Sequence, residues 1–173
     1  MPIRKSILIL VIIAACLTSY SNTLSGDFVW DDNVFITAHP YMKSFQHLPK
    51  FFVQDFWQTG GYTSAQGSGY YRPILAVFCT LDNVVWRLNP LGYHLTNIIL
   101  HILASLLVFL FIELLSKNRI IAFIASLLFS VHPVHTEAVS FISGRVDSIP
   151  LVFFLLSLIL FLKYSSYKRP AFY

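Results

Sequence analysis

The longest apolar stretch in the sequence, residues 93–115, does most to limit the folds open to this chain. As an α-helix rising about 1.5 Å per residue, it is long enough to cross a hydrocarbon layer about 30 Å thick. Three shorter apolar stretches accompany it, over residues 7–17, 120–131 and 149–164. Together the four stretches predict an all-α, polytopic membrane protein.

The composition agrees with a chain whose main solvent is lipid. Hydrophobic residues make up 56% of the sequence and charged residues only 12%, with a mean hydropathy of +0.67. A soluble domain carries about a quarter charged residues, because its surface must stay wet. In a soluble chain the net charge of +4 would suggest nucleic acid, but in a membrane chain the placement of the charges matters more. We therefore expect membrane lipid as a partner and no nucleic acid.

The first apolar stretch follows Arg4 and Lys5 and extends, less strongly, to residue 24. It has the features of a signal-peptide core, and residues 13–16 fit a bacterial lipoprotein cleavage box. A lipoprotein's mature domain would not be as hydrophobic as the rest of this chain, so an uncleaved span over residues 1–24 is the favoured interpretation.

The other spans lie within residues 93–173. The stretch 120–131 is short and stops at His132-Pro133, so it needs flanking residues to complete a crossing. The last stretch, 149–164, has Pro150 in its expected first turn, where the missing N–H does no harm.

Basic residues predict the orientation. Four spans place three basic segments on one side, and the positive-inside rule makes that side cytoplasmic, together with the N-terminus. The loops 21–92 and 132–147 then lie outside the cytoplasm, and they hold seven of the eight acidic residues. We expect an integral protein of a bacterial inner membrane or an endoplasmic reticulum membrane. The basic segments contain Arg4, Lys5, Lys117, Arg119, Lys163, Lys168 and Arg169.

The long first loop, residues 25–92, is more than a linker. It begins with an acidic cluster at residues 27–33 and contains a glycine-rich patch, 60–69, that suggests flexibility. Residues 74–88 mix apolar and charged side chains, which favours an amphipathic helix in the membrane interface over a full span. The aromatic residues of the loop suit either an interfacial belt or a local core; they are Phe51, Phe52, Phe56 and Trp57.

Asp31 and Asp32 are the first candidates for chemistry. Two adjacent carboxylates repel each other, so one could act as a general base near neutral pH, or the pair could hold a divalent cation. A solvated or helix-capping acidic turn is the alternative. The position beside Trp30, just beyond a span, would bring a base close to a lipid-borne substrate.

The second candidate group surrounds the proline break. Arg145 follows a glycine at the expected membrane surface, where a guanidinium suits a phosphate, and His132 and His135 could add donors. His132, His135 and Glu137 could also ligate a metal, but their spacing is a weak signal. Asp147 could cap the last span or pair with Arg145 to fix the loop.

A polar stripe within the long span forms the third group. His94, Asn97, His101 and Ser105 fall on one face of a helix. Polar groups are costly in lipid, so this face should meet other helices or a wet cavity. We expect helix-to-helix hydrogen bonds from the last three, whereas His94, near the extracytoplasmic mouth, could reach a substrate.

Several segments together resemble one family. They are residues 28–32; Tyr71-Arg72-Pro73; residues 89–97 with His101; and His132-Pro133-Val134-His135-Thr136-Glu137-Ala138-Val139 with Gly144-Arg145-Val146-Asp147. The chain is similar in these segments to the transmembrane and tetratricopeptide-repeat O-mannosyltransferases and their bacterial relatives. The resemblance covers nearly the whole chain from the first loop onward.

The resemblance implies a GT-C type membrane glycosyltransferase. Such an enzyme would take a sugar from a polyprenyl-phosphate donor and transfer it to a protein acceptor on the lumenal or periplasmic face. Asp31 or Asp32 would deprotonate the acceptor hydroxyl, and Arg145, with His132 and His135, would hold the departing lipid phosphate. The residues that would line the substrate cavity are Glu137, Asp147, His94 and Arg72. No cofactor is implied, apart from a divalent cation if the aspartates require one.

The chain also departs from this family, whose members carry more spans and an array of tetratricopeptide repeats of about 34 residues each. No such repeat occurs here. We therefore expect an N-terminal fragment of a glycosyltransferase, which need not be active alone. The alternative is a non-catalytic membrane protein, either part of a transporter or an assembly component.

Overall fold

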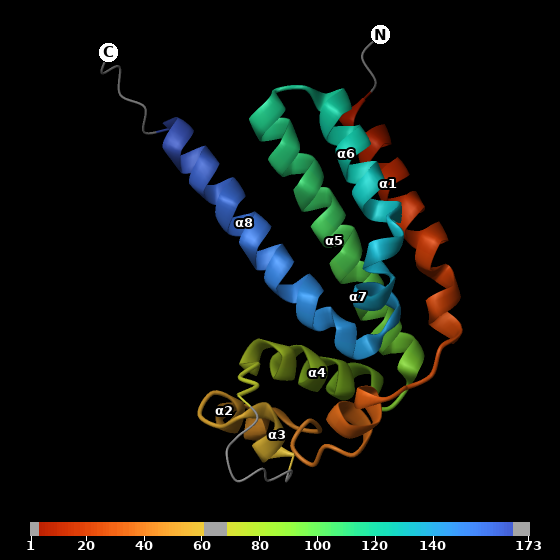
Figure 1. The fold of residues 1–173 in the computed structure, drawn as a ribbon, viewed down its shortest axis with the longest axis vertical. Helices are drawn as coiled ribbons and strands as arrows, with labels where there is room; N and C mark the ends of the chain where they lie inside the picture. Colours follow the sequence, from red (N-terminus) through yellow and green to blue (C-terminus); the bar gives the residue numbers. More distant parts are fainter. Residues whose placement is uncertain (1–3, 61–68, 168–173) are drawn as a thin grey trace.

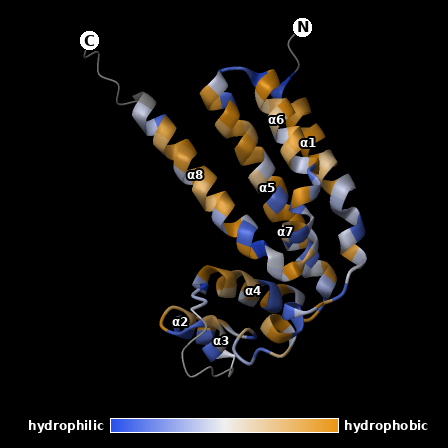
Figure 2. Ribbon diagram, viewed as in Figure 1, coloured by the Kyte–Doolittle hydropathy of each residue, from blue (hydrophilic) through white to orange (hydrophobic). Residues whose placement is uncertain are grey.

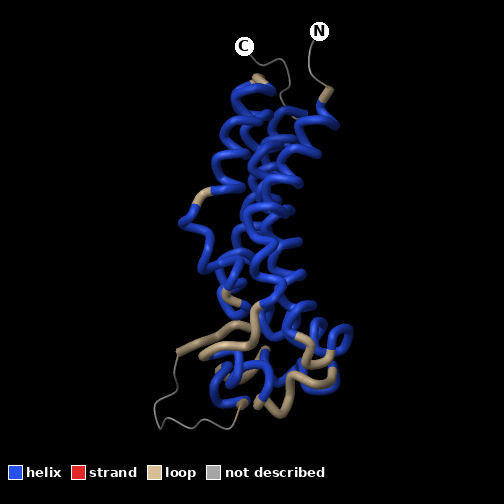
Figure 3. Tube along the Cα trace, turned by 90° about the vertical axis from the view of Figure 1, so that its right-hand side faces the viewer, coloured by secondary structure: helices blue, strands red, loops and turns tan. Residues whose placement is uncertain are grey.

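The computed structural model describes residues 4–60 and 69–167, and within these ranges it is built of helices and loops with no strand (Figure 3). Four long helices run side by side along the molecule, and the first loop folds into a smaller layer across one end (Figure 1). The all-α architecture predicted from the sequence is confirmed.

Three helical segments are long and apolar enough to cross a membrane, by length and composition. They are Lys5–Ser25, Pro90–Ser116 and Ile142–Ser165. A fourth crossing is available if helix α6, Arg119–Val131, is taken together with Pro133–Ser140, which bends away from it by 48°. Figure 2 shows apolar residues along these helices, with polar residues gathered near the bend around α7, Thr136–Ser140. The expected proline break is therefore present.

Local capping explains where the long helices begin. Asn89 accepts a hydrogen bond from the Leu91 amide at the start of α5, Pro90–Ser116, and Pro90 occupies the first helical position. Asn118 caps α6 in the same way, by accepting from the amides of residues 120 and 121. Between these helices, Lys117 adopts the left-handed conformation that ends α5.

The start of the last span was predicted wrongly. Helix α8, Arg145–Tyr167, begins four residues before the apolar stretch, so Pro150 lies inside it and not in its first turn. Asp147 is likewise inside the first turn and is not the N-cap. The helix includes residues 145–148 because Arg145 and Ser148 make tertiary contacts, which an apolar boundary does not reveal.

The polar stripe of α5 faces other helices, as expected for three of its members. Ser126 donates to the Ser105 carbonyl at 2.6 Å, and His101 Nε2 lies 3.0 Å from the Ser130 carbonyl. Asn97 donates to the carbonyls of three residues at the end of α7 and directly after it. These contacts tie α5 to α6 and to the bend without exposing polar groups to lipid.

The basic ends of the helices meet at one end of the bundle. Glu113, near the end of α5, pairs with Lys5 of α1, Lys5–Tyr20, and with Arg119 of α6. The first loop and the bend lie at the opposite end, which we call the loop end (Figure 1). The segments that connect the long helices thus lie alternately at the two ends of the bundle, as the charge pattern requires. Which end faces the cytoplasm stays a prediction.

The first loop forms a compact layer under the bundle. Its longest helix, α4, Pro73–Trp86, crosses the ends of the spans (Figure 1), as an interfacial helix would. Phe51 and Phe56 are almost fully buried, whereas Phe52 is exposed, so the first two form a local core and not an interfacial belt. Most of the patch 60–69 lies outside the described residues. The shorter elements are η1 Ser21–Ser25, η2 Asn33–Thr37, η3 Phe45–His47, α2 Leu48–Phe51 and α3 Phe56–Thr59.

His39 makes this layer sensitive to acid. Its ring is buried, Nδ1 accepts from the Tyr41 amide, and Nε2 lies 3.3 Å from the Thr59 hydroxyl. Burial lowers the pKa of His39 from 6.5 to about 4. The unfolded chain therefore takes up a proton first, and we expect the free energy of unfolding to fall as pH decreases from 6.5 to about 4. Hydrogen exchange of residues 33–59 at several pH values measures this loss.

The variant His39→Gln is the control for this prediction, because its side chain does not titrate. It should flatten the pH dependence of exchange in the layer even if it lowers stability overall. An equally steep pH dependence in the variant would contradict the assignment to His39.

Candidate functional site

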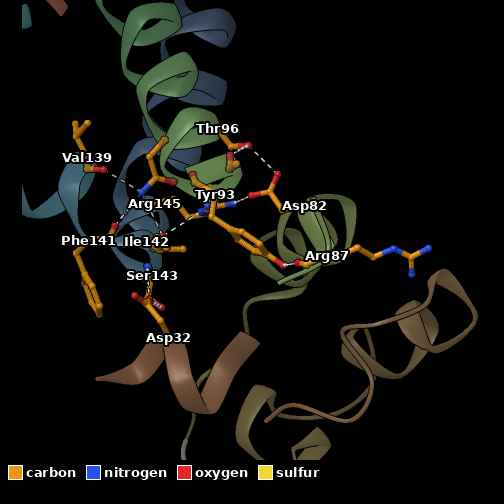
Figure 4. A network of polar contacts seen from close by, with 12 residues as sticks. Asp32, Asp82, Arg87, Tyr93, Thr96, Val139, Phe141, Ile142, Ser143 and Arg145 are labelled. Carbon is orange, nitrogen blue, oxygen red and sulfur yellow. Dashed lines mark hydrogen bonds and ion pairs between the residues drawn. The ribbon is translucent and has the colours of Figure 1, made fainter. Parts of the chain in front are cut away.

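Arg145 lies at the centre of the polar network at the loop end (Figure 4). Its side chain is fully buried and donates three ways: Nε to the Ile142 carbonyl at 3.0 Å, a terminal nitrogen to the Tyr93 carbonyl at 3.0 Å, and the other to the Asp82 carboxylate. The guanidinium is thus enclosed by protein, although the sequence suggested that it contacts a lipid phosphate.

Asp82 is the partner that sequence reasoning missed. It extends from α4 and is buried, and besides the ion pair with Arg145 it accepts a hydrogen bond from Thr96 of α5 at 2.7 Å. One carboxylate therefore joins α4, α5 and α8. The sequence did contain a signal for this pairing: an aspartate in the middle of an otherwise apolar helix usually has a partner, because an unpaired buried charge is costly.

The two adjacent aspartates of the first loop have different environments. Asp32 is fully buried, and its Oδ1 accepts from both the amide and the hydroxyl of Ser143, while Oδ2 accepts from the Val29 amide. Burial raises the pKa of Asp32, an effect that these hydrogen bonds and the charge of Arg145 oppose. Asp32 therefore clamps the first loop to the turn before α8.

Asp31, in contrast, faces an open pocket of about 700 Å³. Its carboxylate is exposed and forms no hydrogen bond or ion pair with any described residue. The opposite wall is α7 and the residue after it, including Glu137, so the two facing loops do contribute carboxylates to one cavity. The pocket is lined by Val29, Trp30, Asp31, Thr136, Glu137, Ser140 and Phe141.

The α7 wall is held by backbone contacts. The Asn97 side chain donates to the carbonyls of Val139 at 3.1 Å and Phe141 at 2.9 Å, which fixes the end of α7 against α5. Gly144 lies so close to this wall that an added Cβ would stand 2.2 Å from the Glu137 carbonyl oxygen. Only glycine permits this approach, so the position of Glu137 depends on Gly144.

The two histidines of the bend lie beside the pocket wall along the chain. His132 is exposed, and its Nδ1 accepts from the Val134 amide at 3.2 Å, which leaves Nε2 as the donor. The His135 ring is half-buried, 4.2 Å from the Phe129 ring and 5.4 Å from that of His101. The His132 ring can therefore present its Nε2–H to an anion at the loop end.

The remaining residues proposed from the sequence do not line this pocket. His94 is buried, and neither ring nitrogen has a partner among the described residues; it faces Gly26, where a Cβ would lie 2.9 Å from Nε2. Arg72 lines a second, mainly apolar pocket of about 200 Å³ between α4 and α8. Asp147 is exposed on the first turn of α8.

The sequence is similar over nearly its whole length to several known proteins, three of which follow. It is 38% identical over 157 residues to human (Homo sapiens) protein O-mannosyl-transferase TMTC2, covering 91% of this chain and 19% of that protein. It is 37% identical over 156 residues to protein O-mannosyl-transferase Tmtc1 of Drosophila melanogaster (90% and 17%), and 36% identical over 167 residues to TMTC3 of Mus musculus (96% and 17%). No family model and no solved structure matches the chain.

Over the matched residues the chain is a relative of the TMTC protein O-mannosyl-transferases. It spans about a fifth of the length of these relatives. The family resemblance seen in the sequence is thereby confirmed, as is an integral membrane protein. The segments that suggested the family include Asp31, Glu137 and Arg145, which the fold brings to the loop end.

A metal centre of three or more ligands does not occur in the described part of this chain. Asp31 and Asp32 do not converge on one point, because Asp32 is turned inward to Ser143. A cation held by that adjacent pair is therefore not supported by this arrangement, whereas Asp31 and Glu137 share a pocket open to solvent.

The Arg145–Asp82 pair gives a direct test of this network. We expect Arg145→Ala or Asp82→Ala to lower the free energy of unfolding by about 3–5 kcal/mol, because each leaves a buried charge unpaired. Thermal unfolding in detergent measures the loss. The double variant Arg145→Met with Asp82→Leu should recover much of it, and double-variant losses equal to the sum of the single ones would contradict the pairing.

Proposed function

We propose that this chain forms part of a membrane glycosyltransferase that moves a sugar, mannose by analogy with its relatives, from a polyprenyl phosphate to a protein hydroxyl. The observation that carries the proposal is the pocket at the loop end, where Asp31 and Glu137 from two distant segments face one cavity. The named activity of the relatives supplies the reaction class. The reaction would take place on the lumenal or periplasmic face, with the N-terminus in the cytoplasm.

Asp31 is the proposed general base. It is exposed to the pocket and is not engaged by the described residues, so it can accept a proton from an acceptor hydroxyl. As that O–H bond breaks, the oxygen forms a bond to the sugar's anomeric carbon, and the bond from this carbon to the phosphate oxygen breaks. The polyprenyl phosphate leaves with the electron pair and one additional negative charge.

The departing phosphate needs cationic or N–H donors, and we assign this role to His132 and His135. They immediately precede the α7 wall of the pocket, and His132 Nε2 is available as a donor. Arg145 keeps these segments in place instead, because all its bonds are directed to protein groups. Arg72 lines the separate, mainly apolar pocket between α4 and α8, so we assign it a contact with the lipid portion of the donor and not with the departing phosphate.

The packing of α5 favours an enzyme over part of a transporter. A transport path through the span would need polar side chains free to meet a solute. Asn97, His101 and the Ser105 carbonyl are instead engaged by neighbouring segments. These three members of the polar stripe therefore serve the packing of the helices.

The adjacent aspartates provide a matched pair of variants for the enzyme proposal. Asp31→Asn should lower sugar transfer by roughly 10²–10⁴-fold, the usual contribution of a general base, with little change in Tm. Asp32→Ala should lower Tm, because the Ser143 and Val29 amides lose a buried charged acceptor.

The assay uses the chain alone and a chimera in which it replaces the matching segment of human TMTC2. Mannose transfer is measured from dolichyl-phosphate mannose and from its undecaprenyl counterpart to a serine- and threonine-containing peptide. No transfer by the chimera from either donor would overturn the enzyme proposal. Full transfer by Asp31→Asn would overturn the assignment of the base alone.

The same assay tests the phosphate contacts. We expect His132→Ala and His135→Ala to raise the KM for the lipid donor roughly tenfold each, which corresponds to the loss of one charge-assisted hydrogen bond. Lys43→Ala removes an exposed cation that lines neither described pocket and should leave this KM unchanged. An equal effect of all three variants would indicate a nonspecific electrostatic contribution.

A further inference from the structure

Trp30 is the most exposed large apolar side chain in the described part of the molecule. Its side chain is 85% exposed, although tryptophan is usually largely buried. The proposed reaction assigns it no role. A single exposed apolar side chain is common on protein surfaces, so the case for a role rests on the backbone conformation of Trp30 and on its place in the pocket.

The backbone at Trp30 is strained. Its φ of +46° is in the left-handed region, which bulky residues rarely adopt because the Cβ approaches the carbonyl oxygen. The residues on either side are held firmly: the Asp32 amide donates to the Val29 carbonyl at 2.9 Å, and the Asp32 carboxylate is clamped by Ser143. Strain that the surrounding contacts maintain in this way is typical of functional sites.

The strain presents the indole to the pocket. Trp30 lines the cavity beside Asp31, and Phe141 meets it edge to face, with 6.3 Å between ring centroids and 72° between planes. Glu137 and the hydroxyl-bearing residues Thr136 and Ser140 line the same cavity. A flat apolar surface is thus combined with several hydrogen-bond acceptors.

This combination matches the chemistry of a sugar ring. A pyranose has C–H groups on its faces, which pack on an aromatic ring, and hydroxyl groups at its edge, which donate to carboxylates. A pocket of about 700 Å³ is within the range of small-molecule sites and accommodates a monosaccharide.

We propose that Trp30 is the platform on which a hexopyranose lies in this pocket, while Asp31 and Glu137 accept hydrogen bonds from its hydroxyls. The proposal rests on the proposed function and identifies the wall of the pocket that contacts the sugar. A membrane-surface tryptophan would also be exposed. However, the two neighbouring carboxylates disfavour anionic lipid headgroups, and the indole lines a cavity.

The first test measures binding of methyl α-D-mannopyranoside to the full chain in nanodiscs, by saturation-transfer NMR and by tryptophan fluorescence. Trp30→Ala should weaken binding roughly tenfold or more, as expected for the loss of an aromatic anchor, and Trp30→Tyr should restore part of it. Phe45→Ala removes an exposed aromatic side chain outside the pocket and should bind like the wild type.

The second test uses the backbone strain. Glycine adopts a positive φ without a steric cost, so Trp30→Gly should keep or raise Tm while losing the sugar. A merely structural tryptophan would instead give a lower Tm. A clear fall in Tm with unchanged sugar binding would overturn the proposal.

The outcomes separate this inference from the proposed function. Sugar binding that depends on Trp30, in a chimera that transfers no mannose, would uphold the platform and overturn the enzyme proposal. If the chimera transfers mannose but its Trp30→Ala variant binds the sugar normally, the enzyme proposal is upheld and the platform is overturned. Quenching of tryptophan fluorescence by brominated phosphatidylcholine in the nanodisc that is lost in Trp30→Ala, with sugar binding intact in that variant, would show a membrane anchor and overturn the platform.

Discussion

The ion pair between Arg145 and Asp82 organises the loop end of this protein. It joins α8 to α4, and the same two side chains reach α5 through the Tyr93 carbonyl and Thr96. An arginine at the first residue of a helix opposes the helix dipole, which favours anions there, so its burial requires a strong partner. A buried ion pair contributes little net stability compared with apolar packing, but breaking it is costly. In this protein the pair holds α4, α5 and α8 in a fixed arrangement.

Asp32 uses this arrangement to position the pocket. Its carboxylate binds Ser143, two residues before Arg145, so the first loop is attached to the same turn that the ion pair holds. Because the clamp turns Asp32 inward, the next residue on its N-terminal side, Asp31, remains exposed. The two adjacent carboxylates therefore lie in different environments: Asp32 holds the loop, and Asp31 faces the pocket.

Much of the fold could be predicted from the sequence because a helix that crosses lipid must be long and apolar. The apolar stretches and the proline at the bend predicted the long helices and their order. The different environments of Asp31 and Asp32 could not be predicted, because they depend on Ser143, 111 positions away. Arg145 was expected to contact a phosphate for the same reason, because its partner Asp82 lies 63 positions away in the sequence. The mixture of apolar and charged residues over 74–88 predicted an interfacial helix, but it gave no indication that the aspartate of α4 would pair with another helix.

The contacts at the loop end suggest why the clamp and the strain occur together. Trp30 can hold a left-handed backbone only if the residues after it are fixed, and Asp32 fixes them through a contact with a distant turn. That turn is itself held by Arg145, whose partner lies in α4. A change in the ion pair would therefore reach the pocket through Ser143 and relax Trp30 and Asp31 together. The pocket is consequently a product of the assembled helices and loop, since no single segment contains the contacts that shape it.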